Sequence, residues 1–279
     1  MLSMSKQVAA FEKEFAAYCG VRHAVGTNSC SSALEIAMRC IGISAGDEVI
    51  VPAETFVATA ATVVREGGRP VFAEVDEKTY CMSLANIRDR VTANTKAVTL
   101  VHMAGMITPD VFVIREFCEQ QNITLIEDAA HAHGATIDGR KSGSLGHVAC
   151  FSFFPTKMIT TAEGGMFVTD DSTLARKADS YRRRGLDLDS PVELFSSIGT
   201  NNRMTEVAAL LGRSQLRHLD TFIQHRRRIA AIYTQALTTS TFANVIHLEP
   251  VPDNIKPSYW RFLLNLDPSV NRETLRDLL

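Results

Sequence analysis

The stretch HVACFSFFPTKMITTAEGGMFVTDD, residues 147–171, consists of two apolar runs separated by a polar turn. The runs HVACFSF (147–153) and GMFVT (165–169) are continuous rather than alternating, as in β-strands that are buried on both faces. Lys157 lies just after the first run, between a proline-bearing turn and a Gly-Gly pair. A lysine held there can be partly desolvated, which lowers its pKa and makes its amine a nucleophile. Most lysines are solvated surface residues, so the position alone leaves the role open.

Further apolar runs alternate with helical stretches on the N-terminal side of this segment. The predicted strands are EVIVP (48–52), PVFAEV (70–75), KAVTLVH (96–102) and ITLIED (123–128). The predicted helices are SALEIAMRCIG (32–42), FVATAATVVREG (56–67) and VFVIREFCEQQ (111–121). Gly42, Gly67 and Asn122 lie at their ends, as is typical of helix C-termini. This alternation predicts an α/β fold whose central sheet is mostly parallel and flanked by helices.

The pattern changes after residue 171, where strand signals become rare. Two long helices are predicted over residues 172–184 and 204–238, with the loop SSIGTNN (196–202) between them. SYWRFLLNLD (258–267) has the pattern of a strand, and NRETLRDLL (271–279) that of a helix start.

Length and charge limit the class of protein. A chain of 279 residues can hold one large domain and part of a second, so we expect a large domain over residues 1–238 and the start of a small C-terminal α+β domain over residues 239–279. With 29 basic and 31 acidic residues, the net charge of −2 gives no support to a nucleic-acid or membrane partner. The cluster Arg226-Arg227-Arg228 is interpreted as a solvated helix face or a subunit contact.

Targeting signals and cysteine usage favour a cytoplasmic location. No apolar run approaches the roughly 18–20 residues that span a bilayer. The N-terminus MLSMSKQVAAFEKEF mixes charge into a helical pattern and lacks the apolar region of a signal peptide. The six cysteines are scattered and form no CxxC pair, which favours free thiols in a reducing compartment over a zinc site.

Two further segments could carry chemistry. Glu127 and Asp128 end a predicted strand, at the edge where ligands gather in open α/β sheets. A buried carboxylate there needs a cationic partner, and a protonated pyridine nitrogen would be one; a helix cap or a structural ion pair is the alternative. The run Ser29-Cys30-Ser31-Ser32 opens a helix, whose first N–H groups can hold a phosphate, although for this segment alone an ordinary serine cap is the more common explanation.

Other residues and motifs receive less weight. His131 and His133 have no third ligand at metal spacing, so no metal site is expected. His102 is interpreted as a core or rim histidine. The chain contains no GxGxxG, P-loop or GxSxG motif, so the corresponding nucleotide-binding and serine-hydrolase readings have no support.

Taken together, these segments resemble the DegT/DnrJ/StrS group of sugar aminotransferases, which depend on pyridoxal 5′-phosphate (PLP). The resemblance runs from about Phe11 to Asp267, and the Lys157 stretch with its EGG turn, combined with EDAAHAHG, is its most specific part. The other stretches are TNSCSSALEIAM, GDEVIVPAETFVATA, PVFAEVD and NRMTEVAALLG. The resemblance implies the PLP-dependent transferase fold of type I, with a partial small C-terminal domain, because family members extend beyond both ends of the match.

The resemblance also implies roles for residues around the cofactor ring. Lys157 would hold PLP covalently and then move the proton. Asp128 would keep the pyridine nitrogen protonated, which makes the ring a better electron sink. Phe56 matches the aromatic residue that stacks on the ring, and His131 matches a position beside the ring and its phenolic oxygen.

Four more residues match positions that bind the cofactor phosphate. Cys30 and Ser31 match the Gly-Thr phosphate cup of the family, where backbone N–H groups bind, so cysteine in place of glycine is a departure. Ser152 matches a phosphate-binding hydroxyl. Asn201 matches an asparagine that reaches the phosphate of the neighbouring subunit, which implies a homodimer with shared active sites.

The implied activity is transfer of an amino group, from a donor such as glutamate, to a keto group of a nucleotide-linked sugar. Related sugar dehydratases carry histidine at the position of Lys157, which argues against that reaction. Two alternatives stay open: a PLP enzyme acting on another cyclic ketone, and a non-catalytic or truncated PLP-fold protein with a regulatory or sensor role.

Overall fold

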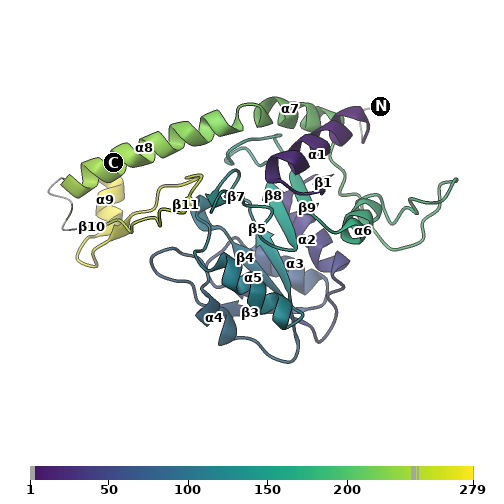
Figure 1. Ribbon diagram of the computed structural model, residues 1–279, viewed down its shortest axis with the longest axis horizontal. Coiled ribbons are helices and arrows are strands. Elements are labelled where there is room, and N and C mark those ends of the chain that lie inside the picture. Colours follow the sequence, from purple (N-terminus) through teal and green to yellow (C-terminus); the bar gives the residue numbers. More distant parts are fainter. Residues whose placement is uncertain (1–3, 240–242, 244, 279) are drawn as a thin grey trace.

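The computed structural model describes residues 4–239, 243 and 245–278, and its centre is a seven-stranded sheet (Figure 1). The strand order is β1-β9-β8-β5-β4-β2-β3. Its strands are β1 (His23–Thr27), β2 (Glu48–Pro52), β3 (Arg69–Ala73), β4 (Thr95–Val101), β5 (Thr124–Asp128), β8 (Val148–Ser152) and β9 (Gly165–Thr169). Only β9 runs antiparallel to its neighbours, so the predicted mostly parallel sheet is confirmed.

Helices cover both faces of this sheet. The helices of the described chain are α1 (Lys6–Cys19), α2 (Cys30–Cys40), α3 (Ala58–Arg65), α4 (Leu84–Arg88), α5 (Val111–Gln120), α6 (Ser172–Arg182), α7 (Glu206–Leu216), α8 (Leu219–Thr239) and α9 (Arg272–Leu278), of which α8 and α9 lie away from the sheet. Strand residues alternate between the faces: Val49 and Val51 pack in the core under α2, α3 and α6, whereas Ile50 packs in the core under α4 and α5. The continuous apolar runs of the sequence thus correspond to strands with two covered faces.

Several local signals act as predicted. Gly42, Gly67 and Asn122 have positive φ angles of 76°, 86° and 56°, which end the helices before them. At the start of α2, the Ser29 hydroxyl accepts the N–H of Ser32 at 3.1 Å, which satisfies one of the free donors of that helix end.

Helix α1 is fixed by a residue far away in the sequence. The carboxylate of Glu206, the first residue of α7, accepts the backbone N–H groups of Ser5, Gln7 and Val8 at 2.6, 2.9 and 3.1 Å. Phe11 of α1 is fully buried, and a Cβ on Gly212 of α7 would lie 2.6 Å from its ring. Close packing of α1 on α7 therefore depends on glycine at position 212.

The structure differs from the prediction in three ways, two of them in the C-terminal part. The expected helix 204–238 is interrupted between α7 and α8. The expected strand 258–267 is wrong except at β12 (Asn265–Leu266), which pairs with β10 (Ile246–His247), because Tyr259 has a φ of +52° that a strand cannot contain. β1 was not predicted at all.

A smaller three-stranded sheet joins β11 (Ile255–Lys256), β6 (Thr136–Ile137) and β7 (Arg140–Lys141). Helix α8 extends away from the central sheet, with α9 and β10 near its far end (Figure 1). Among the described helices, none combines the length and apolar character needed to cross a bilayer.

Candidate active site

The carboxyl ends of β5 and β8 bring Asp128 and Lys157 to one region of the sheet edge. The two strands are parallel neighbours, and Asp128 is paired with Cys150 in the register. Lys157 follows β8 in a loop that is folded back on Phe153, which exchanges backbone hydrogen bonds with Gly164 and Thr161. The charges of Asp128 and Lys157 are close enough for each to influence the pKa of the other.

Asp128 is a carboxylate with little access to water. Its side chain is 6% exposed and accepts hydrogen bonds from the Thr59 hydroxyl at 2.8 Å and from the Ala130 N–H at 3.2 Å. Burial raises the pKa of Asp128 above its ordinary value, and the two hydrogen bonds and the charge of Lys157 oppose that shift. A cationic partner would stabilise the ionised form in this setting.

Thr59 is a site residue that the sequence analysis missed. It lies on α3, is fully buried and also shares a 2.8 Å hydrogen bond with the hydroxyl of Thr55. Nothing in the composition of FVATAATVVREG distinguishes Thr59 from Thr62, whose hydroxyl bonds only to its own helix. Only its hydrogen bond to Asp128, at the end of β5, distinguishes it.

Lys157 is half-buried, and burial lowers its pKa, while Cys30 and Asp128 act in the opposite direction. Among the described residues, no carboxylate lies within ion-pair distance of its amine. The Nζ atom instead lies 4.2 Å from the ring centre of Trp260. This lysine is therefore an amine that can lose its proton more readily than an exposed one.

The start of α2 lies beside these two residues. Cys30 is half-buried and Ser31 exposed, and the charges of Asp128 and Lys157 both act on the Cys30 thiol, whose pKa burial raises. Gly165 on β9 permits this arrangement, because a Cβ there would lie 2.6 Å from the Cys30 nitrogen and closer still to the Ser29 carbonyl. The last glycine of the EGG turn thus allows the backbone of β9 to lie close to the backbone at the start of α2.

Ser152 and Phe56 lie at the same edge of the sheet, on different elements. Ser152 ends β8 and is 6% exposed, and its hydroxyl accepts the Phe154 N–H at 3.4 Å. Phe56 immediately precedes α3 and is 69% exposed, which is unusual for a large aromatic side chain.

His131 lies three residues beyond Asp128 and stacks on Trp260, with ring centres 3.8 Å apart and planes inclined by 13°. Burial and the charge of Lys157 lower the pKa of His131 to about 3, so the ring is neutral at physiological pH. Trp260 was not predicted as a site residue, because its segment was interpreted as a strand.

Asn201 lies within the same chain at the edge of this region. Its side chain accepts a hydrogen bond from Arg203 at 2.9 Å, and its carbonyl lies 3.5 Å from the amide nitrogen of Asn28, just before α2. The predicted contact with a neighbouring subunit stays a prediction.

A network of hydrogen bonds lies behind the site on the opposite side of β5. The buried carboxylate of Glu127 accepts bonds from His102 at 2.8 Å and from the N–H groups of Gly143, Leu145 and Gly146 at 2.7–2.9 Å. Burial alone would raise the pKa of Glu127, but these donors lower it. The adjacent acids 127 and 128 therefore have opposite pKa shifts, and His102 is the core histidine that was expected.

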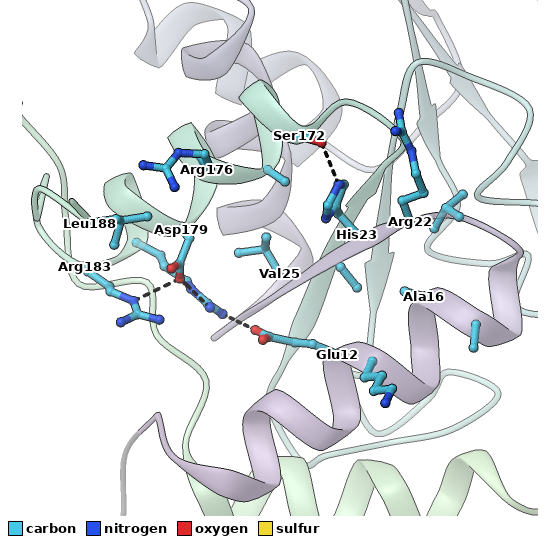
Figure 2. Close-up of a pocket in the computed structure, with 16 residues that line it drawn as sticks. Glu12, Ala16, Arg22, His23, Val25, Ser172, Arg176, Asp179, Arg183 and Leu188 are labelled. Atoms are coloured by element: carbon cyan, nitrogen blue, oxygen red, sulfur yellow. Dashed lines mark hydrogen bonds and ion pairs between the residues drawn. The ribbon is translucent and has the colours of Figure 1, made fainter.

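A separate groove of about 690 Å³ lies between α1, β1 and α6 (Figure 2). There Arg182 is bound by Glu12, Asp179 and the carbonyl of Gly26, and Arg183 also pairs with Asp179. None of the predicted site residues lines this groove. Within the described ranges, no group of three metal-ligating side chains is present either.

Two comparisons with known sequences bear on this site. The sequence model of the DegT/DnrJ/EryC1/StrS aminotransferase family matches residues 1–279. The chain is 39% identical, over 275 residues, to the GDP-perosamine synthase of Caulobacter vibrioides, and the match covers 99% of this chain and 72% of that protein.

Solved structures are similar over nearly the whole chain. The aminotransferase TlmJ from Streptoalloteichus hindustanus is 32% identical with a TM-score of 0.93, covering 99% of this chain and 75% of that one. The Streptococcus pneumoniae protein Spr1654 in its PLP-form is 25% identical with a TM-score of 0.87, covering 96% and 72%.

Proposed function

Because the chain belongs to the DegT/DnrJ/EryC1/StrS aminotransferase family, we propose that it transfers an amino group from glutamate to the keto carbon of a nucleotide-linked sugar. The family and the fold make it a PLP-dependent aminotransferase of fold type I, as predicted from the sequence. The name of its relative, GDP-perosamine synthase, supports a nucleotide-linked sugar as the acceptor. Six free cysteines support a reducing, cytoplasmic setting.

The residues at the sheet edge fit PLP in charge and in hydrogen-bonding groups. Asp128 is a buried carboxylate without a cationic partner at hydrogen-bond distance in the described part of the chain, and Lys157 is a half-buried amine without a carboxylate. The N-terminus of α2 offers the backbone donors of Cys30 and Ser31 to an anion. This combination of a carboxylate, an amine and a helix N-terminus is the observation that carries the proposal.

Asp128 would accept a hydrogen bond from the protonated nitrogen of the pyridine ring. Thr59 and the Ala130 N–H hold the carboxylate in one orientation, so the acceptor is already in place before the cofactor arrives. When bound, PLP supplies an electron sink for the negative charge that develops as the substrate carbon loses its proton.

Lys157 would anchor the cofactor through its amine and would then carry the proton between the substrate carbon and the cofactor. Both tasks need an amine that is unprotonated part of the time, and the burial that lowers its pKa provides this. Phe56 would pack on the ring, which accounts for the exposure of its side chain. His131, as a neutral ring, would lie beside the phenolic oxygen.

Cys30, Ser31 and Ser152 would hold the phosphate. The helix contributes backbone N–H groups and the positive end of its dipole, so the cysteine at position 30 does not prevent binding. Asn201 would reach the phosphate of a partner subunit in a homodimer with shared sites. We also assign residues 1–238 to a PLP-binding domain and residues 239–279 to the start of a small C-terminal domain.

Absorbance spectroscopy and borohydride reduction test the proposal directly. We expect a near-visible band when PLP is added to the protein, its loss on reduction, and a cofactor mass fixed on the peptide that contains Lys157. A screen of keto-sugar nucleotides with glutamate should then yield 2-oxoglutarate. A protein that binds PLP at another residue, or not at all, would contradict the proposal.

A further inference from the structure

The segment Lys256–Arg261 is docked against the site by its backbone. The N–H of Ser258 donates to the Gly105 carbonyl at 3.1 Å, and the N–H of Arg261 donates to the Ala104 carbonyl at 3.3 Å. The buried Ser258 hydroxyl donates to the carbonyl of His131 at 3.0 Å. The segment therefore bonds directly to the residue beside the cofactor position.

Gly105 makes this contact possible. Its φ is +96°, and a Cβ at this position would lie 3.0 Å from both the His131 carbonyl and the Tyr259 nitrogen. Any other residue would be strained and would push the segment away. The absence of a side chain at Gly105 thus allows the segment Lys256–Arg261 to lie against the backbone of His131.

Helix α8 fixes the segment from the other side. Arg226 donates to the carbonyls of Tyr259 and Trp260 at 3.2 and 3.1 Å, and Arg227 donates to those of Pro257 and Lys256, both at 2.8 Å. Arg226 and Arg227 therefore bind the segment Lys256–Arg261. The sequence had suggested a solvated helix face or a subunit contact for them. Bonds from guanidinium groups are among the stronger hydrogen bonds of proteins.

All of these contacts place one side chain, Trp260, over the site. Its Nε1–H donates to the Thr156 carbonyl at 2.6 Å, in the loop that carries Lys157. Its indole stacks on His131 and lies 4.2 Å from the Lys157 amine. The indole thus contacts the two residues proposed to work on the ring and its phenolic oxygen.

We infer that Trp260 is a positioning residue of the active site, which holds the His131 ring and the Lys157 side chain in their working orientations. The inference rests on the proposed function of those two residues. Lysine has four rotatable side-chain bonds and His131 has no described partner for its Nδ1 atom, so neither is fixed by hydrogen bonding alone. A flat apolar surface restricts both without competing for a proton.

The experiment compares Trp260→Ala with Trp260→Phe, which keeps a flat ring, and with the neighbouring control Tyr259→Phe. The first readout is the reactivity of the Lys157 amine toward acetic anhydride across pH, followed by peptide mass in the cofactor-free protein. Trp260→Ala admits water to the amine, which raises its midpoint, because burial is the main cause of the lowered pKa. The lost cation–π contact acts in the opposite direction and reduces this rise without reversing it.

The second readout is steady-state kinetics of the holoenzyme. Trp260→Ala should lower kcat by about tenfold with a smaller change in KM, the scale of one lost stacking and cation–π contact. Trp260→Phe should retain most of kcat and of the labelling midpoint, and Tyr259→Phe should retain both. Trp260→Leu, which fills similar space without a flat ring, replaces the alanine variant if that one does not fold.

The inference is overturned if Trp260→Ala keeps the wild-type midpoint and kcat, or if Trp260→Phe loses as much as Trp260→Ala. The labelling readout needs no cofactor, and borohydride trapping on wild-type Lys157 tests the proposed function separately. A trapped cofactor with unaffected Trp260 variants rejects the positioning role alone, whereas no trapped cofactor rejects the proposed function.

Discussion

Replacing Asp128 with asparagine removes a charge and leaves the size of the side chain almost unchanged. In the structure the carboxylate has two donors, Thr59 and the Ala130 N–H. Asparagine offers one oxygen to these two donors, so one of them faces an amide nitrogen. The protonated ring nitrogen would then lose its anionic partner.

The rate loss follows from the burial of this side chain. A contact between unit charges is worth about 4 kcal/mol at the effective dielectric of such sites, and a neutral hydrogen bond to asparagine restores about 1–1.5 kcal/mol. The remaining difference of roughly 2.7 kcal/mol corresponds to about a hundredfold in kcat. Cofactor binding should weaken less, because the phosphate contacts are unchanged.

The same substitution should make the cofactor-free protein more stable at neutral pH. Burial raises the pKa of Asp128 in the folded state above its ordinary value of 3.8. The folded state therefore binds the proton of Asp128 more tightly than the unfolded state does. The contribution of this proton to the free energy of unfolding is present at low pH and is lost as pH rises through the folded pKa. A neutral amide avoids that loss, and the unfolding midpoint at pH 7 should rise.

Glu127→Gln provides the matched control one residue away. The pKa of Glu127 is lowered by its donors, so its contribution to stability is present above the unfolded pKa and is lost as pH falls through the folded one. Each carboxylate oxygen of Glu127 accepts two of its four hydrogen bonds, so the amide nitrogen of glutamine would face two donors and should destabilise the protein by about 1–3 kcal/mol. Thermal unfolding and conversion of glutamate to 2-oxoglutarate measure both variants. Near-normal turnover in Asp128→Asn, or equal destabilisation by both substitutions, would refute the reasoning.

Three other perturbations have definite expected results. Lys157→Ala should abolish the near-visible band and turnover together, and a borohydride-stable lysine adduct in that variant would contradict the assignment. If Asn201 serves the partner's site, mixing Lys157→Ala chains with Asn201→Asp chains should restore part of the activity. The reason is that one active site of the mixed dimer then carries neither substitution. Proven mixed dimers that recover no activity would reject shared sites. Gly165→Ala should weaken PLP binding and lower the unfolding temperature, because its Cβ meets the backbone at Cys30, and unchanged values for both would show that the helix start can shift.

The sequence was most informative where buried strands meet polar residues. Continuous apolar runs located six of the seven central strands. Asp128 is the last residue of one of them, β5, and Lys157 lies just beyond the end of another, β8. β1 was missed because its sequence HAVGT contains only two apolar residues, Ala24 and Val25. The roles of the site residues came from a family resemblance, and their distances could not come from the sequence.

Contacts between distant segments account for what was missed. Trp260 lies in a segment whose conformation depends on Arg226 of α8 and on the glycine at position 105, neither of which has a local signal. Thr59 is distinguished only by its hydrogen bond to Asp128, 69 residues further along the chain. The break between α7 and α8 falls at Arg217 and His218, where no proline or glycine marks it.

The bonds from Glu206 to the start of α1 also set an order for folding during synthesis. They join residues about 200 positions apart in the sequence. At roughly 5–20 residues per second, a ribosome would need on the order of 10–40 s to make the chain between them. During that interval α1 has exposed donors at its first turn, and Phe11 lacks the surface of α7. Helix α1 is therefore a segment that chaperones can bind until α7 emerges from the ribosome.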